Sequence, residues 1–316
     1  MNTTETLLEA IETGDPVQVQ AALDRHPEWK QTLNDPIPGG AFGGTALLAA
    51  LHRRNRAVID VLLRCGADIN ARSHWWAGSF GVLDQPTGLE DFLIERGARV
   101  DAHAAARLGK LDRLKELILA DPLLVHARGG DGQTPLHFAA TVEIAEFLLA
   151  HGADINVLDV DHESTPAQYM ARERQDVARY LVSRGSRSDL LMAAALGDVE
   201  LARKFLDEDP ALIRMNVSSE WFPMRDPRAG GTIYIWVLGG NKMAHHLARE
   251  FKHDNVLRML NERTPKELEL VFACELGDEA RLRELLQQQP DLPSKLTNAD
   301  HQRLIAAAES SNARTV

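Results

Sequence analysis

One pattern recurs along the chain and constrains its fold more than any other feature. Each copy has a short helix rich in small residues, a glycine, and an amphipathic helix that ends near Gly-Ala. The clearest copies are DGQTPLHFAATVEIAEFLLAHGADIN (131–156), GGTALLAALHRRNRAVIDVLLRCGADIN (43–70) and AHAAARLGKLDRLKELILADPLLVHAR (102–128), and weaker ones lie at 6–29, 190–213, 245–262 and 270–292. Gly152 and Gly185 are 33 residues apart, and a repeat of this length predicts helix pairs that stack and bury their apolar faces against one another.

The copy at 131–156 shows why such a segment forms a helix pair. Thr134 can cap the first helix, and Pro135 suits its first turn, where no backbone N–H is needed. Ile144 and Leu148 belong to the apolar stripe of the second helix, because residues four apart share one helix face. Gly152 can adopt the left-handed conformation that ends a helix. The local chemistry therefore agrees with the repeat.

These segments resemble the ankyrin repeat, most clearly in TPLHFAA at 134–140 and in the GADIN endings at 66–70 and 152–156. The resemblance extends over nearly the whole chain, as about eight helix pairs. It implies an all-α solenoid that forms a single domain over residues 1–316. Within that domain we expect a degenerate repeat at 72–99 and a last repeat that stops after its first helix. Bacterial members of the family look similar around DHESTPAQY and GGTIYIW.

The resemblance also implies the family's usual function, which is the binding of a protein partner. The partner would lie on a concave face formed by the first helices and the finger loops, which join consecutive helix pairs. His103, His137 and His246 occupy the histidine position of the repeat, where the resemblance implies hydrogen bonds between neighbouring fingers. Self-association through the open C-terminal end is a further expectation, because a solenoid end normally carries a polar cap.

Composition limits the other function classes. The formal net charge is −11, which argues against nucleic-acid binding and against docking on anionic lipid. The longest apolar stretch, LLMAAAL at 190–196, is too short to span a bilayer. The N-terminus has no signal-peptide pattern, and Cys65 and Cys274 lie on separate helical segments, so we expect a cytoplasmic protein without disulfides. No strong metal or cofactor motif is present, and we predict neither.

Three finger loops depart from the short form RGGDGQT seen at 128–134. The first, 71–88, carries Trp75 and Trp76 where a polar turn is expected. The second, 157–171, places four ionisable groups within five residues: Asp159, Asp161, His162 and Glu163. The third is an enlarged finger at 213–240. Departures from a repeating pattern are where function is expected.

The third loop has a strand-like pattern. Residues 213–217 and 232–237 alternate between aliphatic and polar or aromatic side chains, which predicts a β-hairpin near 213–238. One face would pack on neighbouring helices, and the other would present Tyr234 and Trp236. The stretch between the strands, 220–231, contains Trp221, Phe222, Arg225, Asp226 and Arg228. A structural brace over a weak repeat junction is the alternative.

We therefore expect a binding surface made by the three unusual loops, in which aromatic side chains stack and arginines bind anions. The candidate binding residues are Trp75, Trp76, Arg128, Asp159, Asp161, His162, Trp221, Arg225, Asp226, Arg228, Tyr234 and Trp236. For the acidic residues, the simpler interpretation is a turn in which Asp159 and Asp161 accept backbone amides. A hard-metal site and an acid–base pair are the alternatives for Asp159, Asp161, His162 and Glu163.

A second hypothesis is a small-molecule receptor or an enzyme. If the loops at 71–80, 157–164 and 218–236 meet, they would form an aromatic and arginine-lined pocket for an anionic or aromatic ligand. The catalytic residues would then be His162 or Glu163 as general base, with Asp161 beside them and Arg225 on the substrate. The sequence favours the binding module over the enzyme.

Overall fold

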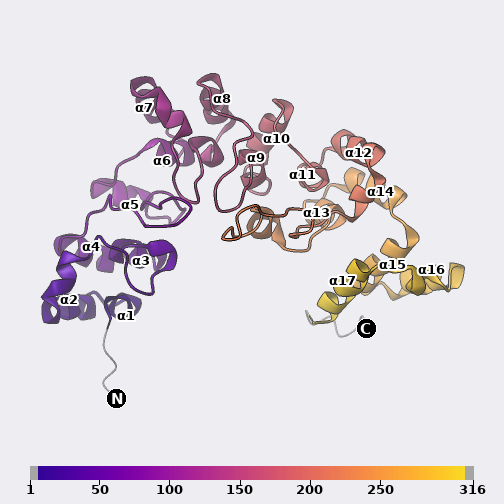
Figure 1. Ribbon diagram of the computed structural model, residues 1–316, viewed down its shortest axis with the longest axis horizontal. Coiled ribbons are helices and arrows are strands. Elements are labelled where there is room, and N and C mark those ends of the chain that lie inside the picture. The colour runs from indigo at the N-terminus through magenta and orange to yellow at the C-terminus, as the bar shows by residue number, and fades with distance from the viewer. Residues whose placement is uncertain (1–5, 310–316) are drawn as a thin grey trace, which may run out of the picture. The chain divides into compact units, whose positions relative to one another are not determined.

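The computed structural model describes residues 6–309 (Figure 1). The chain divides into two compact units. The first unit contains Met1–Ser188 and Val217–Asn241, and the second contains Asp189–Asn216 and Lys242–Val316. Each unit is built from paired helices, so the predicted all-α class is confirmed. Whether all repeats form a single solenoid domain stays a prediction. Within the described residues, every helix is too short or too polar to cross a bilayer.

The first unit stacks its helix pairs in sequence order. α1 packs on α2 and α3, α3 packs on α4, α6 packs on α7 and η4, and η4 packs on α8 and α9. Its elements are α1 (Leu7–Glu12), α2 (Pro16–Arg25), η1 (Pro27–Gln31), η2 (Ala41–Gly43), α3 (Ala46–His52), α4 (Arg56–Arg64), α5 (Glu90–Glu95), α6 (Ala102–Arg107), α7 (Leu111–Ala120), η3 (Pro122–His126), η4 (Pro135–Phe138), α8 (Val142–Ala150), α9 (Pro166–Tyr169), α10 (Gln175–Ser183) and η6 (Ile235–Gly239).

Caps and apolar stripes explain this stacking. Asn55 caps α4 by accepting the amide of Val58 at 3.1 Å, and its side chain also donates to the carbonyl of Gly14 at 2.7 Å. One residue thus starts a helix and ties its pair to the preceding one. The apolar sides of the helices then merge into a common core that includes Leu23, Leu47 and Ile59, all buried.

The second unit repeats the same design. α11 packs on α12 and α13, α13 packs on α14, and α15 packs on α16 and α17. Its elements are α11 (Leu190–Leu196), α12 (Val199–Glu208), η5 (Pro210–Arg214), α13 (Ala244–Glu250), α14 (Asp254–Arg263), α15 (Lys266–Glu275), α16 (Glu279–Gln288), η7 (Leu292–Lys295) and α17 (Asn298–Glu309). The point where the second helix of the last repeat would begin lies outside the described residues.

The predicted hairpin near 213–238 is wrong. Residues 6–309 contain isolated β-bridges but no strand. Residues 210–214 form the turn η5, and residues 235–239 form the π-helical turn η6. Thr232, Ile233 and Tyr234 are all buried in succession, whereas a strand directs consecutive side chains to opposite faces. The alternation in the sequence therefore does not correspond to a buried and an exposed face.

Candidate functional site

The segment 217–241, here called the long loop, lies against the loop at 157–164, here called the acidic loop. Both belong to the first unit. The amide of Gly230 donates to the carbonyl of Asp161 at 2.9 Å, and the carbonyl of Gly231 accepts from Nδ1 of His162 at 2.8 Å. Arg172 donates to two further carbonyls of the long loop, those of Val237 and Leu238. The long loop is thus fixed by hydrogen bonds from outside itself.

Glu163 provides the other attachment of the long loop. Its Oε1 accepts the amides of Arg225 and Asp226, each at 2.9 Å, and its Oε2 lies 3.6 Å from Nε of Arg225. Glu163 has a φ of 44°, a left-handed conformation that costs a residue with a Cβ about 1–2 kcal/mol. A strained backbone conformation persists where the surrounding structure requires it. Here the conformation directs the Glu163 carboxylate at two backbone amides.

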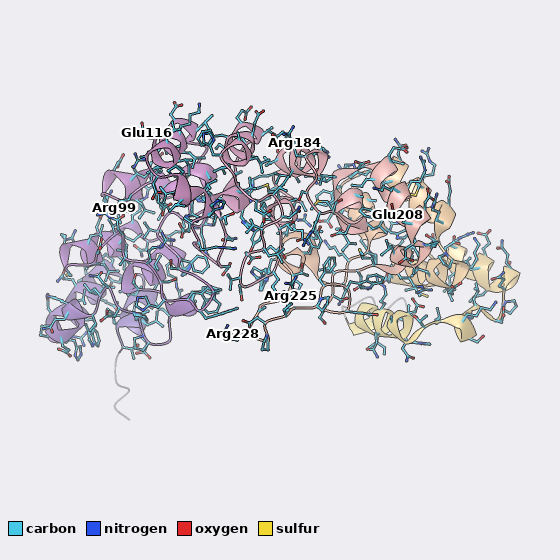
Figure 2. The ribbon with its side chains drawn as sticks, turned by 45° about the horizontal axis from the view of Figure 1, so that its top comes forward. Arg99, Glu116, Arg184, Glu208, Arg225 and Arg228 are labelled. Carbon is cyan, nitrogen blue, oxygen red and sulfur yellow. The ribbon has the colours of Figure 1, made fainter. Side chains whose placement is uncertain are left out.

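The third unusual loop, 71–80, here called the tryptophan loop, meets the long loop through Arg228. The Arg228 guanidinium lies over the Trp76 ring, 4.3 Å from its centroid. Asp226 holds the same guanidinium with both carboxylate oxygens, at 3.1 and 2.7 Å. These bonds from Arg228 lower the pKa of Asp226 to about 2. The three loops singled out in the sequence therefore do meet, and Figure 2 shows Arg225 and Arg228 on the long loop.

Beneath the long loop lies a cluster of ionisable side chains. Nε2 of His162 is 3.7 Å from Oδ2 of Asp161 and 3.8 Å from Oδ2 of Asp131. Asp161 and His162 are buried, and Asp131 is mostly buried. Burial raises the pKa of Asp131 to about 6; the nearby His162 opposes this shift, and the carboxylates of Asp161 and Asp159 add to it.

Asp159 has a structural role. Its two carboxylate oxygens accept the amides of His162 and Ser164, each at 2.8 Å, as the simpler interpretation of the acidic loop predicts. Burial nevertheless raises the pKa of Asp159 above its usual value. Asp159 thus shapes the loop that carries Asp161 and His162.

The remaining predicted site residues have different environments. Arg128 donates to the carbonyls of Gly132 and Leu158, so it joins two neighbouring fingers. Tyr234 is fully buried and packs edge-on against Phe222, with ring centroids 5.3 Å apart. The expectation that Tyr234 lies on a presented face is therefore wrong.

The aromatic residues of the two loops differ in exposure. Trp236, in contrast to Tyr234, is 72% exposed. Trp75 and Trp221 are half-buried. The Trp75 ring makes an edge contact with Phe42, with centroids 5.0 Å apart.

Asp131 is the site residue that sequence reasoning missed. It lies in the ordinary finger DGQT, which matches the repeat and therefore shows no departure from it. A signal was nevertheless present, because Asp131 precedes TP at 134–135 by three residues and Asp161 precedes TP at 165–166 by four. The two match once the extra residue of the acidic loop is allowed for. Stacked repeats place equivalent residues side by side.

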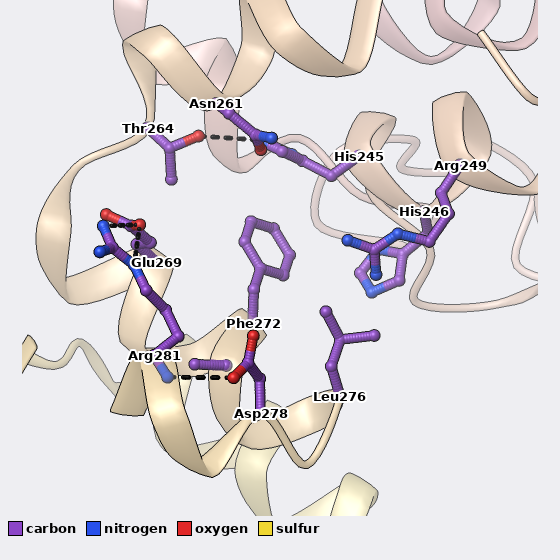
Figure 3. A pocket seen from close by; sticks show the side chains of 11 residues that line it. His245, His246, Arg249, Asn261, Thr264, Glu269, Phe272, Leu276, Asp278 and Arg281 are labelled. Atoms are coloured by element: carbon purple, nitrogen blue, oxygen red, sulfur yellow. Dashed lines mark hydrogen bonds and ion pairs between the residues drawn. The ribbon is translucent and has the colours of Figure 1, made fainter. Parts of the chain in front are cut away.

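A hollow lies in the second unit (Figure 3). It has a volume of about 230 Å³, and its lining includes Phe272, Arg281 and Glu269. Arg281 pairs with Glu269, and Nε2 of His245 bonds to the hydroxyl of Thr264 at 2.8 Å. Burial lowers the pKa of His245 to about 3 and so keeps its ring neutral. The hollow therefore offers a ligand an aromatic wall, and the charged side chain of Arg249 also lies on its lining.

Two family models match the chain. Residues 102–191 match ankyrin repeats in three copies, and residues 42–74 match a single ankyrin repeat. The putative ankyrin repeat protein YahD of Escherichia coli is 28% identical over 165 residues, which cover 46% of this chain and 81% of that protein. The palmitoyltransferase akr1 of Schizosaccharomyces pombe is 42% identical over 65 residues, or 20% of this chain and 10% of that protein.

The chain spans only 10–18% of the length of the first four curated relatives that it matches. Among solved structures, a predatory endopeptidase of Bdellovibrio bacteriovorus in complex with an immunity protein includes a similar chain. The identity is 22% and the TM-score 0.34, over 58% of this chain and 100% of that one. A likeness at that TM-score carries no argument about function.

Proposed function

Because the chain is an ankyrin repeat protein, we propose that it is a binding module that recognises a protein partner through the exposed side chains of the long loop. Ankyrin repeats generally mediate protein–protein interaction. We assign the contact with the partner to a patch of four side chains: Trp236, Ile235, Arg225 and Arg228. Trp and Arg are the residues that dominate binding energy at protein interfaces.

The observation that carries the proposal is the contrast between a fixed backbone and the side chains that stay exposed on it. The backbone of the long loop is held by Glu163, His162 and Arg172. Its side chains nevertheless stay accessible, since Trp236 is 72% exposed and the Arg225 side chain 80% exposed. A surface that is already ordered loses less conformational entropy on binding.

The alternative of a small-molecule pocket or an enzyme has weaker support. Trp76 and Arg228 contact each other instead of leaving a space between them. Glu163 is engaged with two amides and with Arg225, so it is not a free general base. Trp236 is too exposed to be enclosed by walls, as small-molecule sites require. The ligand-binding prediction therefore gives way to a protein partner.

The test is site-specific photocrosslinking followed by affinity measurement. A benzophenone amino acid replaces Trp236 in one variant and Leu123, which is 76% exposed on η3, in the control. We expect a protein captured from position 236 and not from position 123. With that partner purified, Trp236→Ala should weaken binding about 30-fold or more, the loss of a hot-spot residue, and Leu123→Ala should leave affinity within twofold.

The proposal fails if both positions capture the same proteins equally, or if Trp236→Ala binds the captured partner as tightly as the unchanged chain. Arg225→Ala gives an independent check on the patch. It should weaken binding and make the remaining affinity less dependent on salt, because a rim charge acts mainly through electrostatic attraction.

A further inference from the structure

We propose that Asp131, Asp161 and His162 bind one divalent transition-metal ion, Zn²⁺ more tightly than Mn²⁺. The inference does not rest on partner binding, and either proposal can fail without the other. The three residues come from two consecutive fingers of the first unit, and their ligand atoms lie within 4.8 Å of one another. Two carboxylates and an imidazole are a donor set that such ions accept.

The first argument is the proton position on His162. A carbonyl oxygen only accepts hydrogen bonds, so the 2.8 Å contact between Nδ1 and Gly231 means that Nδ1 carries the proton. Nε2 is then the ring nitrogen that can present a lone pair to an ion. Metal-binding histidines are typically fixed in this way, with the second ring nitrogen donating to a backbone carbonyl or a carboxylate.

The second argument is what faces that lone pair. The nearest carboxylate oxygens of Asp161 and Asp131 lie 3.7 and 3.8 Å from Nε2. Three electron-rich atoms so close together in a buried place repel one another unless a metal ion or a shared proton lies among them. Ligand atoms on one Zn²⁺ or Mn²⁺ ion, each about 2.0–2.2 Å from it, lie up to about 4.2 Å apart. The observed spacing therefore suits a shared ion.

The third argument comes from two buried donors beside the cluster. The hydroxyl of Tyr169 and the indole N–H of Trp75 are buried, and their nearest acceptors are carboxylates, that of Asp159 for Tyr169 and that of Asp131 for Trp75. The Tyr169 ring lies 6.3 Å from the His162 ring, edge to face.

Both donors therefore face carboxylates of this region, and a donor to a carboxylate favours its charged form. The charged form is the one that binds a metal ion.

The donor set also selects among ions. Ca²⁺ takes six to eight oxygen ligands, and Mg²⁺ keeps most of its water and prefers carboxylate and phosphate oxygens. An imidazole ligand favours the later divalent ions. Tighter binding of Zn²⁺ than of Mn²⁺, and still weaker binding of Mg²⁺ and Ca²⁺, is therefore part of the proposal.

The ion would join three parts of the first unit. Asp131 belongs to the finger at 128–134, and Asp161 and His162 belong to the acidic loop. Through Gly230 and Gly231, which bond to Asp161 and His162, the ion would also hold the long loop. Metal binding should then slow the opening of the long loop without changing its fold.

The experiment uses the full chain stripped with a chelator, and equilibrium dialysis against Zn²⁺ alone and Mn²⁺ alone. We expect saturation at one ion per chain. Asp131→Asn should raise the dissociation constant about 100-fold or more, because loss of a direct ligand costs at least as much as loss of its outer partner. The carbonyl of Asp131, which accepts the amides of Val160 and Asp161, is unchanged in this variant, so the finger should fold.

The matched control is His246→Gln, which removes another histidine paired with a carboxylate, that of Glu275 at 3.2 Å in the second unit. It should bind Zn²⁺ and Mn²⁺ as the unchanged chain does. A Mn²⁺ electron paramagnetic resonance signal that broadens with the unchanged chain and the control, but not with Asp131→Asn, would support the site. Absence of saturable binding, or equal affinity in Asp131→Asn, would overturn it and leave a proton shared by His162 and the carboxylates.

Discussion

The ordinary finger at 128–134 and the acidic loop at 157–164 are successive versions of the same turn. Each carries an aspartate before a TP pair, and each contains positive φ. In the ordinary finger the positive φ values belong to two glycines, Gly130 at 53° and Gly132 at 81°; in the acidic loop the residue is Glu163, with a φ of 44°. A turn that only needs to pack uses glycine, whereas a turn that holds another segment tolerates strain in order to place a side chain.

The two turns also differ in their histidines. His137, which follows the ordinary finger, accepts the amide of Thr134 through Nδ1 and bonds through Nε2 to the carbonyl of Ser164. Both nitrogens are satisfied by the backbone, as the family resemblance implies. His162 has the opposite proton placement, and its Nε2 faces carboxylates. One histidine serves the scaffold, and the other is chemically available.

The largest effect should come from breaking the ordinary finger. A Cβ on Gly132 would lie 2.6 Å from Cβ of Val160 and 2.8 Å from the carbonyl oxygen of Ala77, at a φ of 81°. Gly132→Ala should therefore lower the free energy of unfolding of the first unit by about 3 kcal/mol, from backbone strain and overpacking together. Urea unfolding followed by circular dichroism measures it.

Gly152→Ala is the control for Gly132→Ala. Gly152 has a similar φ of 94°, but a Cβ there meets nothing within 4 Å. Its cost should be the backbone term alone, about 1 kcal/mol. Equal losses in the two variants would mean that the close approach of the two fingers at Val160 does not matter.

The second-largest effect should appear as the pH falls, in the stability that His137 contributes. Burial lowers the pKa of His137 to about 3, so the unfolded chain, with a pKa near 6.5, binds the proton that the folded chain refuses. The contribution of His137 to the free energy of unfolding is therefore at its full value above pH 6.5. It falls by about 1.4 kcal/mol per pH unit between pH 6.5 and 3. His137→Gln should remove that slope.

The chain itself suggests glutamine as the replacement. Gln168, at the same position in the next repeat, accepts the amide of Thr165 at 2.8 Å, as His137 does for Thr134. Urea unfolding at several pH values between 4 and 7 compares the two proteins. Parallel pH profiles for His137→Gln and the unchanged chain would contradict the assignment.

The smallest effect should come from restoring glycine to the acidic loop. Glu163→Gly relieves the backbone strain but removes the acceptor of two amides in the long loop. The global free energy of unfolding should change by less than about 1 kcal/mol, while the long loop opens about tenfold more often. Trypsin, which cuts after Arg225 and Arg228, should then cleave the native protein about tenfold faster. Glu116→Gln, on α7, should not change the cleavage rate.

The helix pairs were predictable because their determinants are local. Caps such as Asn55 and Thr141, and the apolar positions of the second helices, lie within each repeat. The hairpin was wrong because burial of Thr232, Ile233 and Tyr234 depends on contacts with the rest of the first unit, which alternation along the chain cannot reveal. Asp131 was missed for the related reason that its partners, Asp161 and His162, lie one repeat away.

The central claim is that the acidic loop fixes the backbone of the long loop while Trp236, Arg225 and Arg228 stay exposed on it. Hydrogen exchange of the unchanged full chain, followed by mass spectrometry over residues 217–241, tests it most directly. We predict that the amides of Arg225, Asp226 and Gly230, which donate to the acidic loop, exchange at least about 100-fold more slowly than unprotected amides. Exchange of these three amides at the unprotected rate would contradict the account.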